Sequence, residues 1–224
     1  MAVYADIACP WAHVAVHRLH AFRSKLGLEE RVTFDPRPFP LEIFNEKPTP
    51  KKVLDAEVPV TADLEPDAGW QVWQRPDHQY PVTTLLALEA VQAVKEQGAR
   101  QSECLDHALR TALFAHSRTV SMRHEILDIA SGCDDVSVEH LAQALDDGRA
   151  RSTIMACKEQ AAAGEVRGSP HLFLPDGTDS HNPGIDMEWT GHHGLSFPVV
   201  ASDQPEIYEG LLTRAAGEGK ERHG

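Results

Sequence analysis

The sequence predicts an α/β fold in which a split core, βαβ followed by ββα, surrounds an inserted helical subdomain. Three observations predict it. The first 35 residues have the pattern of strand, helix and strand. A block from about residue 81 to residue 164 has helical periodicity in its apolar residues, and strand patterning returns at Val166 before a terminal helix.

A single domain accounts for the length of the chain. Its 224 residues are enough for one elaborated domain with a sizeable buried core. We expect one domain over residues 1–224, with the core at about 1–80 and 165–224 and the helical insertion at about 81–164. No internal repeat or low-complexity tract indicates a further division.

The predicted core opens with a buried strand at residues 3–7 that leads directly into a helix. Gly27 suits the C-terminal end of this helix, because glycine adopts the left-handed conformation without strain. Residues 31–35 can form the next strand, and the strand-helix-strand order implies a parallel, right-handed crossover. The apolar residues at helical spacing are Ala15, Leu19, Phe22 and Leu26.

Prolines dominate the segment from Pro36 to Pro81. Nine prolines fall in this segment and no apolar periodicity persists, so we expect a long irregular excursion with short helical turns. Five helices follow, each with apolar residues at helical spacing. They are marked by residues 85–94, 105–112, 126–130, 138–145 and 154–161.

Strand patterning returns after the helical block. Residues 171–174 form an apolar strand, and the turn signal Pro175-Asp176-Gly177 follows it. We place the partner strand a little further on, near residues 182–185. A terminal helix, introduced by Pro205, is marked by Ile207, Leu211, Leu212 and Ala215.

Composition and charge exclude several classes of partner. The net charge is -13, from 34 acidic and 21 basic residues, so nucleic acid and anionic membrane are not expected partners. No signal-peptide pattern opens the sequence, and no apolar run approaches the roughly 18 residues of a membrane span, so we expect a soluble, cytoplasmic protein. Four cysteines without a close pair are expected to be free thiols in that reducing compartment.

Cys9 lies where the first strand meets the first helix. Unpaired backbone N–H groups and the positive end of the helix dipole converge there, and both favour a thiolate over a thiol. Pro10 suits the first helical position, and Trp11 offers an aromatic wall beside the sulfur. We therefore predict that Cys9 is a reactive nucleophile, the alternative being a small buried hydrophobic residue.

Pro170 stands at the start of the apolar strand that follows the helical block. A proline in this position is well placed to have a cis peptide bond, which leaves the Ser169 backbone free to pair with an extended substrate. The alternative is an ordinary proline at a strand edge.

Together these motifs resemble the DsbA family of thioredoxin-like proteins, and most closely its FrnE-like group. The resemblance covers nearly the whole chain. It rests on Tyr4-Ala5-Asp6-Ile7 before Cys9-Pro10-Trp11-Ala12, on the helical insertion, and on Val166-Arg167-Gly168-Ser169-Pro170 before a strand. A thioredoxin-like fold and a thiol-disulfide activity are what this resemblance implies.

The resemblance also implies roles for individual residues. Cys9 is the implied nucleophile, Pro170 is the implied cis-proline beside it, and Ser169 is implied to hydrogen-bond a bound peptide. The substrate-binding surface is completed by the residues after the cysteine, namely Pro10, Trp11 and Ala12.

Ala12 departs from the motif of dithiol relatives, which read Cys-Pro-Trp-Cys where this chain reads Cys-Pro-Trp-Ala. Cys9 can attack a disulfide and form a mixed disulfide, but no second thiol in the motif can resolve it. Release must come from glutathione, from another protein thiol or from the client's own second cysteine. A two-electron oxidase cycle within the motif is therefore excluded.

Other candidate groups have weaker arguments. His13 lies one turn after Cys9 and would lower the pKa of the thiol if its imidazole were charged and pointed at the sulfur, the alternative being a solvated helix face. Cys104 and Cys157 fall on apolar helix faces and are expected to be buried and inert, while Cys133 is expected in a surface loop. No histidine spacing indicates a metal site, so none is predicted.

Three functions remain open at this point. The first is a thiol-disulfide oxidoreductase or isomerase that uses Cys9 alone and exchanges with client proteins or with glutathione as co-substrate, without another cofactor. The second is a glutathione-dependent isomerase or transferase, similar to hydroxychromene carboxylate isomerases and kappa-class transferases. The third is a non-catalytic, peptide-binding scaffold. For each of them we expect a monomer or homodimer.

Overall fold

The structure of the chain, a computed structural model, describes residues 1–193 and 195–217. The order of helices and strands confirms the predicted α/β fold class. The last residues of the predicted domain, 218–224, lie outside the described residues. Within the described part, none of the helices combines the length and hydrophobicity that a membrane span requires.

A four-stranded mixed sheet forms the centre of the core. Its strand order is β2-β1-β3-β4, with β1 and β2 parallel and the remaining pairs antiparallel. The mixed pattern follows from the chain order, because α1 provides a crossover from β1 to β2 whereas β3 and β4 are joined by a tight turn. The strands are β1 (Ala2–Ala5), β2 (Asp35–Pro38), β3 (His171–Phe173) and β4 (Asp179–His181).

Helix α1 (Pro10–Lys25) carries the active-site motif at its first turn. It begins with Pro10, whose missing N–H costs nothing at a helix start, and Gly27 follows its end with a φ of 63°. Leu19 on this helix is fully buried against the sheet and α9 (Ile207–Ala215). Burial on several sides fixes the position of the helix start relative to the sheet.

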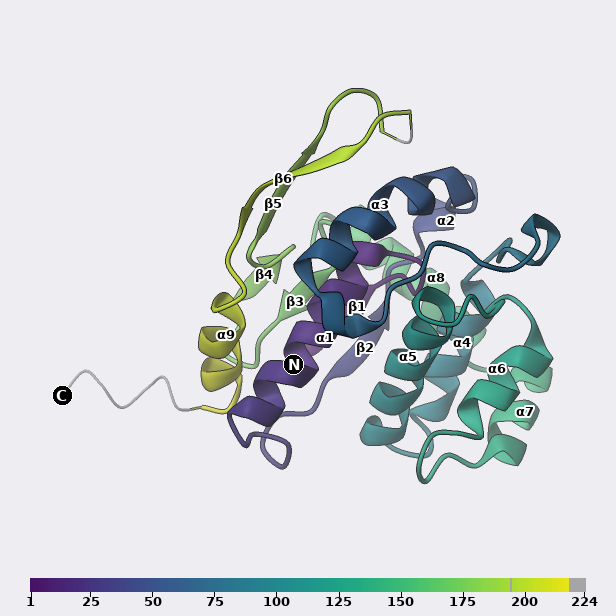
Figure 1. Cartoon of the computed structure of the whole chain (residues 1–224). Helices are drawn as coiled ribbons and strands as arrows, with labels where there is room; N and C mark the ends of the chain where they lie inside the picture. Colours follow the sequence, from purple (N-terminus) through teal and green to yellow (C-terminus); the bar gives the residue numbers. More distant parts are fainter. Residues whose placement is uncertain (194, 218–224) are drawn as a thin grey trace.

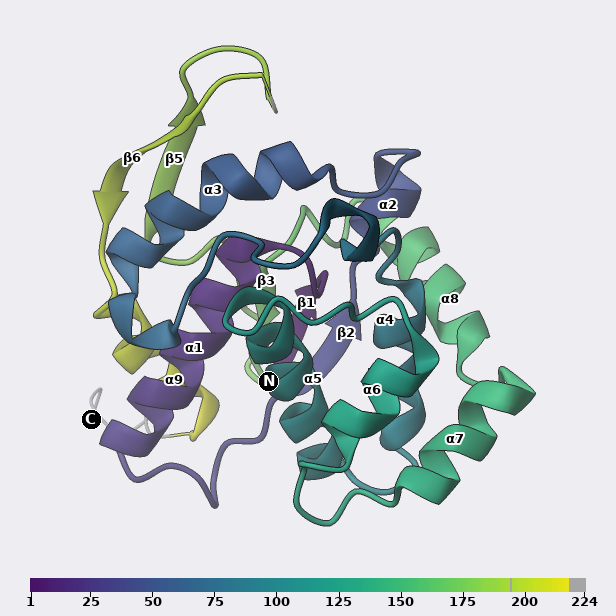
Figure 2. The same ribbon diagram turned by 45° about the vertical axis from the view of Figure 1, so that its right-hand side comes forward.

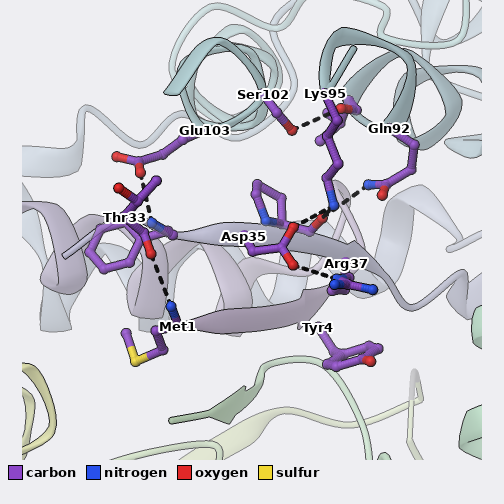
Figure 3. Close-up of polar contacts among 12 residues, drawn as sticks. Met1, Tyr4, Thr33, Asp35, Arg37, Gln92, Lys95, Ser102 and Glu103 are labelled. Atoms are coloured by element: carbon purple, nitrogen blue, oxygen red, sulfur yellow. Dashed lines mark hydrogen bonds and ion pairs between the residues drawn. The ribbon is translucent and has the colours of Figure 1, made fainter. Parts of the chain in front are cut away.

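Strand β2 lies later in the chain than predicted, at Asp35–Pro38 rather than at 31–35. It is an edge strand, where prolines are tolerated. Side chains from the helical block satisfy its backbone, as Figure 3 shows: Gln92 and Lys95 donate to the Pro36 carbonyl at 3.0 and 2.6 Å. These distant partners explain why a local pattern did not locate the strand.

The proline-rich segment is more helical than predicted. It contains α2 (Leu41–Phe44) and the 14-residue helix α3 (Lys51–Leu64), followed by the 3₁₀ turns Pro66–Ala68 and Asp77–Gln79. Helix α3 continues through Pro59 and buries an apolar face against α1. The expectation of an irregular excursion was therefore wrong for α3.

The helical block was predicted correctly as five helices. A separate hydrophobic core joins them and extends to Ile7 and Ala8 just ahead of α1. This core connects the block directly to the active-site turn. The helices are α4 (Leu85–Val94), α5 (Ala99–Phe114), α6 (Arg123–Ala130), α7 (Val138–Asp147) and α8 (Arg151–Ala162).

The strands after the helical block differ from the prediction. The partner of β3 is β4 at Asp179–His181 rather than residues 182–185, because the turn at 175–177 lets the chain return at once. A second sheet, the hairpin β5 (Ile185–Trp189) and β6 (Pro198–Asp203), was not predicted. Figures 1 and 2 show this hairpin as an arm that runs alongside α3 and extends beyond it.

Gly184, at the base of the arm, has a φ of 78°, and a Cβ built there would lie 2.6 Å from the Gln204 carbonyl oxygen. We expect Gly184→Ala to lower the free energy of unfolding by about 2–3 kcal/mol, from the strained φ and the backbone contact together. Urea denaturation checks this. Gly177→Ala is the matched control, because Gly177 has a similar φ of 86° with nothing within 4 Å. Equal losses in the two variants would contradict the role of the contact.

Candidate active site

Cys9 occupies the N-cap of α1 and faces the loop before β3. Its side chain is only 4% exposed, and its Sγ donates a hydrogen bond to the Ser169 carbonyl oxygen at 3.2 Å. The backbone of Ala12, in the first turn of α1, acts to lower the pKa of this thiol. The structure thus brings together two motifs that are 160 residues apart in the sequence.

The Ser169–Pro170 peptide bond is cis. The Ser169 hydroxyl accepts a hydrogen bond from the Asp6 N–H at 2.9 Å, and the Asn182 N–H donates to the Pro170 carbonyl at 3.0 Å. The Ser169 N–H donates no backbone hydrogen bond to the described part of the chain. This N–H is therefore available beside the Cys9 sulfur.

Asp6 is a site residue that the sequence analysis did not single out. Its carboxylate is buried and accepts hydrogen bonds from Ala8 N–H at 2.8 Å, Leu41 N–H at 2.8 Å and the Thr84 hydroxyl at 3.0 Å. Burial raises the pKa of Asp6. One carboxylate thus fastens the active-site turn to α2 and to the start of α4. The sequence feature that could have identified Asp6 is an acidic residue at the end of an apolar strand.

Glu57, on α3, is a second functional group that was missed. It is 5% exposed, and its Oε1 accepts a hydrogen bond from Trp11 Nε1 at 2.9 Å. Burial raises the pKa of Glu57 to about 7, with the Trp11 hydrogen bond opposing this shift. Sequence patterns missed Glu57 because they did not predict the helix that carries it.

The protonation state of Cys9 differs from the sequence-based prediction. Burial raises the pKa of the Cys9 thiol to about 12, and the negative charges of Glu57 and Asp6 add to this effect. The Ser169 side chain and the Ala12 N–H favour the thiolate, but they do not outweigh burial. The prediction of a thiolate held by the helix start is therefore wrong for the free protein, in which Cys9 is a thiol.

His13 does not lie where either sequence interpretation placed it. Its ring is 1% exposed, stacks on Phe114 at 5.0 Å between centroids, and meets Trp70 edge-on at 4.6 Å. Burial lowers the pKa of His13 well below its usual value, so the imidazole is neutral. It is neither on a solvated face nor a source of positive charge for Cys9.

The other three cysteines are free thiols outside this motif. Cys157 is buried, whereas Cys104 is partly exposed. Cys133 is 6% exposed, not on the surface as predicted, because it packs into the core of the helical block. Within residues 1–193 and 195–217, no three His, Cys, Asp or Glu side chains are grouped so that they could hold a metal ion.

A cavity of about 750 Å³ opens beside Cys9. Trp11, Glu57 and Ser169 line it together with residues from the α2–α3 segment and from the β5–β6 hairpin. The hairpin contributes Met187, Trp189, His193 and Leu195. We call this cavity the Cys9 groove.

Two lysines give the Cys9 groove a local positive charge in an acidic protein. Lys47 and Lys52 line it and are exposed. No ion pair joins either of them to an acidic side chain of the described residues. Their charges are therefore available to an anionic ligand near Cys9.

The raised pKa of Glu57 makes stability depend on pH. Because the folded protein holds this proton more tightly than the unfolded chain, the stabilisation is complete below about pH 4.5 and is lost as the pH rises through about 7. The full effect is on the order of 3 kcal/mol. We expect the free energy of unfolding of the wild type to fall over this range relative to that of Glu57→Gln, as urea denaturation at each pH would show.

The control for this prediction is Asp63→Asn, which removes an exposed charge from the same helix. Its stability should follow that of the wild type between pH 4.5 and pH 8. A constant difference between wild type and Glu57→Gln across this range would contradict a raised Glu57 pKa.

The fold resembles several solved structures of disulfide-exchange proteins. A probable DsbA oxidoreductase from Streptomyces coelicolor is 20% identical, with a TM-score of 0.65 over 100% of this chain and 91% of that one. The cytosolic disulfide reductase DsbM from Pseudomonas aeruginosa is 13% identical, with a TM-score of 0.57 over 96% and 94%. DsbM has also been solved with GSH, and that structure gives a TM-score of 0.54. These similarities show a shared fold.

The comparison with protein families is more specific. No curated protein sequence matches the chain. The model of the DSBA-like thioredoxin domain matches residues 1–195, which include Cys9, the helical block and the Ser169–Pro170 loop. The chain therefore belongs to the family of DSBA-like thioredoxin domain proteins.

Proposed function

We propose that this protein is a thiol-disulfide oxidoreductase or isomerase that uses Cys9 alone and forms mixed disulfides with glutathione or a client protein. The observation that carries the proposal is the 3.2 Å contact between Cys9 Sγ and the Ser169 carbonyl, in a groove large enough for a peptide-like ligand. The motif at the start of α1 also supports placing the chain in the FrnE-like group. We assign the activity to the cytoplasm, where reduced glutathione is abundant.

The reaction follows from the chemistry of one sulfur. Cys9 loses its proton and attacks a disulfide, a new S–S bond forms, and the second substrate sulfur leaves as a thiolate that takes up a proton. Ala12 carries no thiol, so a free thiol from glutathione or from the client must attack the mixed disulfide. That attack regenerates the Cys9 thiol and forms a new disulfide outside the protein.

Substrate alignment is assigned to the residues around the sulfur. The unpaired Ser169 N–H can pair with the backbone of an extended substrate next to the cis bond of Pro170. Pro10 and Trp11 line the same groove and provide apolar contact. Ala12, with its side chain buried, leaves the approach to Cys9 free of a second thiol.

Glutathione suits the charges at the Cys9 groove. It carries two carboxylates, and Lys47 and Lys52 offer unpaired positive charges beside a reactive sulfur. The solved structure of DsbM with GSH supports glutathione as a ligand of this fold.

Oxidised glutathione and intact mass spectrometry test the proposal. The wild type should gain one glutathionyl group, and Cys9→Ala should gain none. Cys157→Ser is the matched control, because it removes a buried thiol outside the motif and should still be modified. Modification of Cys104 or Cys157 in preference to Cys9 would reject the proposal.

A second candidate is the non-catalytic, peptide-binding scaffold, which the deep burial and raised pKa of Cys9 favour. The rate of alkylation distinguishes the two functions. If Cys9 is catalytic, its rate of alkylation by iodoacetamide should exceed that of an isolated, exposed thiol with the same pKa. A scaffold would show slower alkylation in the folded protein than in urea, with unchanged binding of peptides after Cys9→Ala.

A further inference from the structure

Glu57 stands out among the buried titratable groups because it lines the Cys9 groove on a helix that the family motif does not include. It is 5% exposed and lies within electrostatic range of the Cys9 sulfur. Trp11 fixes one of its oxygens, since Trp11 Nε1 donates to Oε1 at 2.9 Å. No described side chain or backbone N–H donates to Oε2.

We propose that Glu57 is the proton acceptor and donor for Cys9 during thiol-disulfide exchange, acting through Oε2 directly or across one water molecule in the groove. This inference rests on the proposed function, because it assigns a second residue to the reaction of Cys9. Trp11 acts as the positioning residue, since its hydrogen bond leaves Oε2 as the free oxygen.

The need for a proton acceptor follows from the buried state of the sulfur. The Cys9 thiol is 4% exposed and donates a hydrogen bond to a carbonyl, so a thiolate is not stable there before the attack begins. The proton must therefore leave the sulfur as the S–S bond forms. Glu57 can both accept and donate a proton at neutral pH, because its pKa of about 7 leaves both protonation states populated.

The step balances without any further reactant. The Cys9 proton passes to the Glu57 carboxylate, Cys9 Sγ bonds to one sulfur of the substrate disulfide, and the other sulfur leaves with the electron pair of the broken S–S bond. The Glu57 carboxylic acid then protonates this departing thiolate. The products are a Cys9 mixed disulfide, a free thiol and the original carboxylate.

Other titratable groups face Glu57 and have to be separated from it in a pH experiment. Asp6 lies ahead of α1, Tyr80 is close enough to sense the charge of Glu57, and Lys52 and His193 line the same groove. His193→Gln therefore accompanies every measurement below.

The test compares the rate of Cys9 glutathionylation by oxidised glutathione in wild type, Glu57→Gln, Asp63→Asn and His193→Gln from pH 5.5 to 9. Glutamine keeps an oxygen acceptor for Trp11 and removes only the proton-accepting carboxylate. If Glu57 takes the proton, Glu57→Gln lowers the rate at least about 10-fold at pH 7.5 and abolishes the inflection near pH 7. Asp63→Asn keeps both the rate and the inflection, and His193→Gln keeps the inflection.

The opposite result overturns the inference. If Glu57 acts only as a nearby negative charge, its removal lowers the Cys9 pKa, and Glu57→Gln then reacts faster than the wild type. Loss of the inflection in His193→Gln would move the role to His193. If Cys9 of the wild type is not modified at any pH, the proposed function fails as well, and the two failures are thereby distinguished.

Discussion

We expect Ala12→Cys to convert a mixed disulfide on Cys9 into an internal disulfide. Ala12 lies in the first turn of the helix whose N-cap is Cys9, so a thiol introduced by this substitution starts within the same turn of α1. After Cys9 takes a glutathionyl group from oxidised glutathione, the introduced thiol attacks Cys9 Sγ and releases reduced glutathione. Intact mass spectrometry should show a loss of two hydrogens in the variant and one glutathionyl group in the wild type.

Ala12→Ser is the matched control, because serine adds a side-chain atom of similar size without a thiol. It should retain the glutathionyl adduct as the wild type does. Release of glutathione by both wild type and Ala12→Ser would show that Cys104, Cys133 or Cys157 resolves the adduct, and the single-thiol mechanism would then be wrong. The wild-type adduct must also disappear on addition of reduced glutathione.

The core of this fold could be predicted because its signals are local. The helix after Cys9 has its apolar residues at helical spacing and is followed by Gly27, and both features lie within a few turns of each other. The five helices of the insertion were predicted for the same reason. The position of strand β2, in contrast, depends on hydrogen bonds from Gln92 and Lys95. These residues are distant in the sequence, so a local pattern does not reveal the strand.

Helix α3 shows why proline count is a poor guide in this segment. Pro50 precedes the helix and suits its N-terminus, while Pro59 lies inside it without ending it. Burial of Leu54 and Val58 in the core of the helical block, together with the contacts between α3 and α1, stabilises α3 in spite of Pro59. Tertiary packing outweighed the local signal.

The sequence identified the cysteine and the loop of the candidate site, but it did not predict the ionisation state of the cysteine. Cys9 and Ser169 could be paired from a family resemblance, and the structure places them in contact. The ionisation of Cys9 depends instead on how deeply the turn is buried and on Asp6 and Glu57 nearby. Burial is a property of the whole fold, so a helix dipole argument from sequence gave the wrong sign.

Arg18→Met should lower the free energy of unfolding by about 3–5 kcal/mol. The Arg18 side chain is 1% exposed and donates to both oxygens of Asp203, at 2.7 and 2.8 Å, and to Glu65. Methionine fills much of the volume but leaves two partly buried carboxylates without their partner. Urea denaturation measures the loss, with Lys25→Met as the control for an exposed cation on the same helix.

The loss should be reduced when the orphaned charge is removed as well, so Arg18→Met with Asp203→Asn should be more stable than Arg18→Met alone. A loss below about 1 kcal/mol for Arg18→Met would place the pair among weak surface ion pairs. Because Arg18 joins α1 to the end of α3 and to β6, its contacts fix two helices that line the Cys9 groove and the hairpin that contributes Met187 and Trp189 to it. Arg18→Met should therefore also slow Cys9 glutathionylation under conditions in which the protein remains folded.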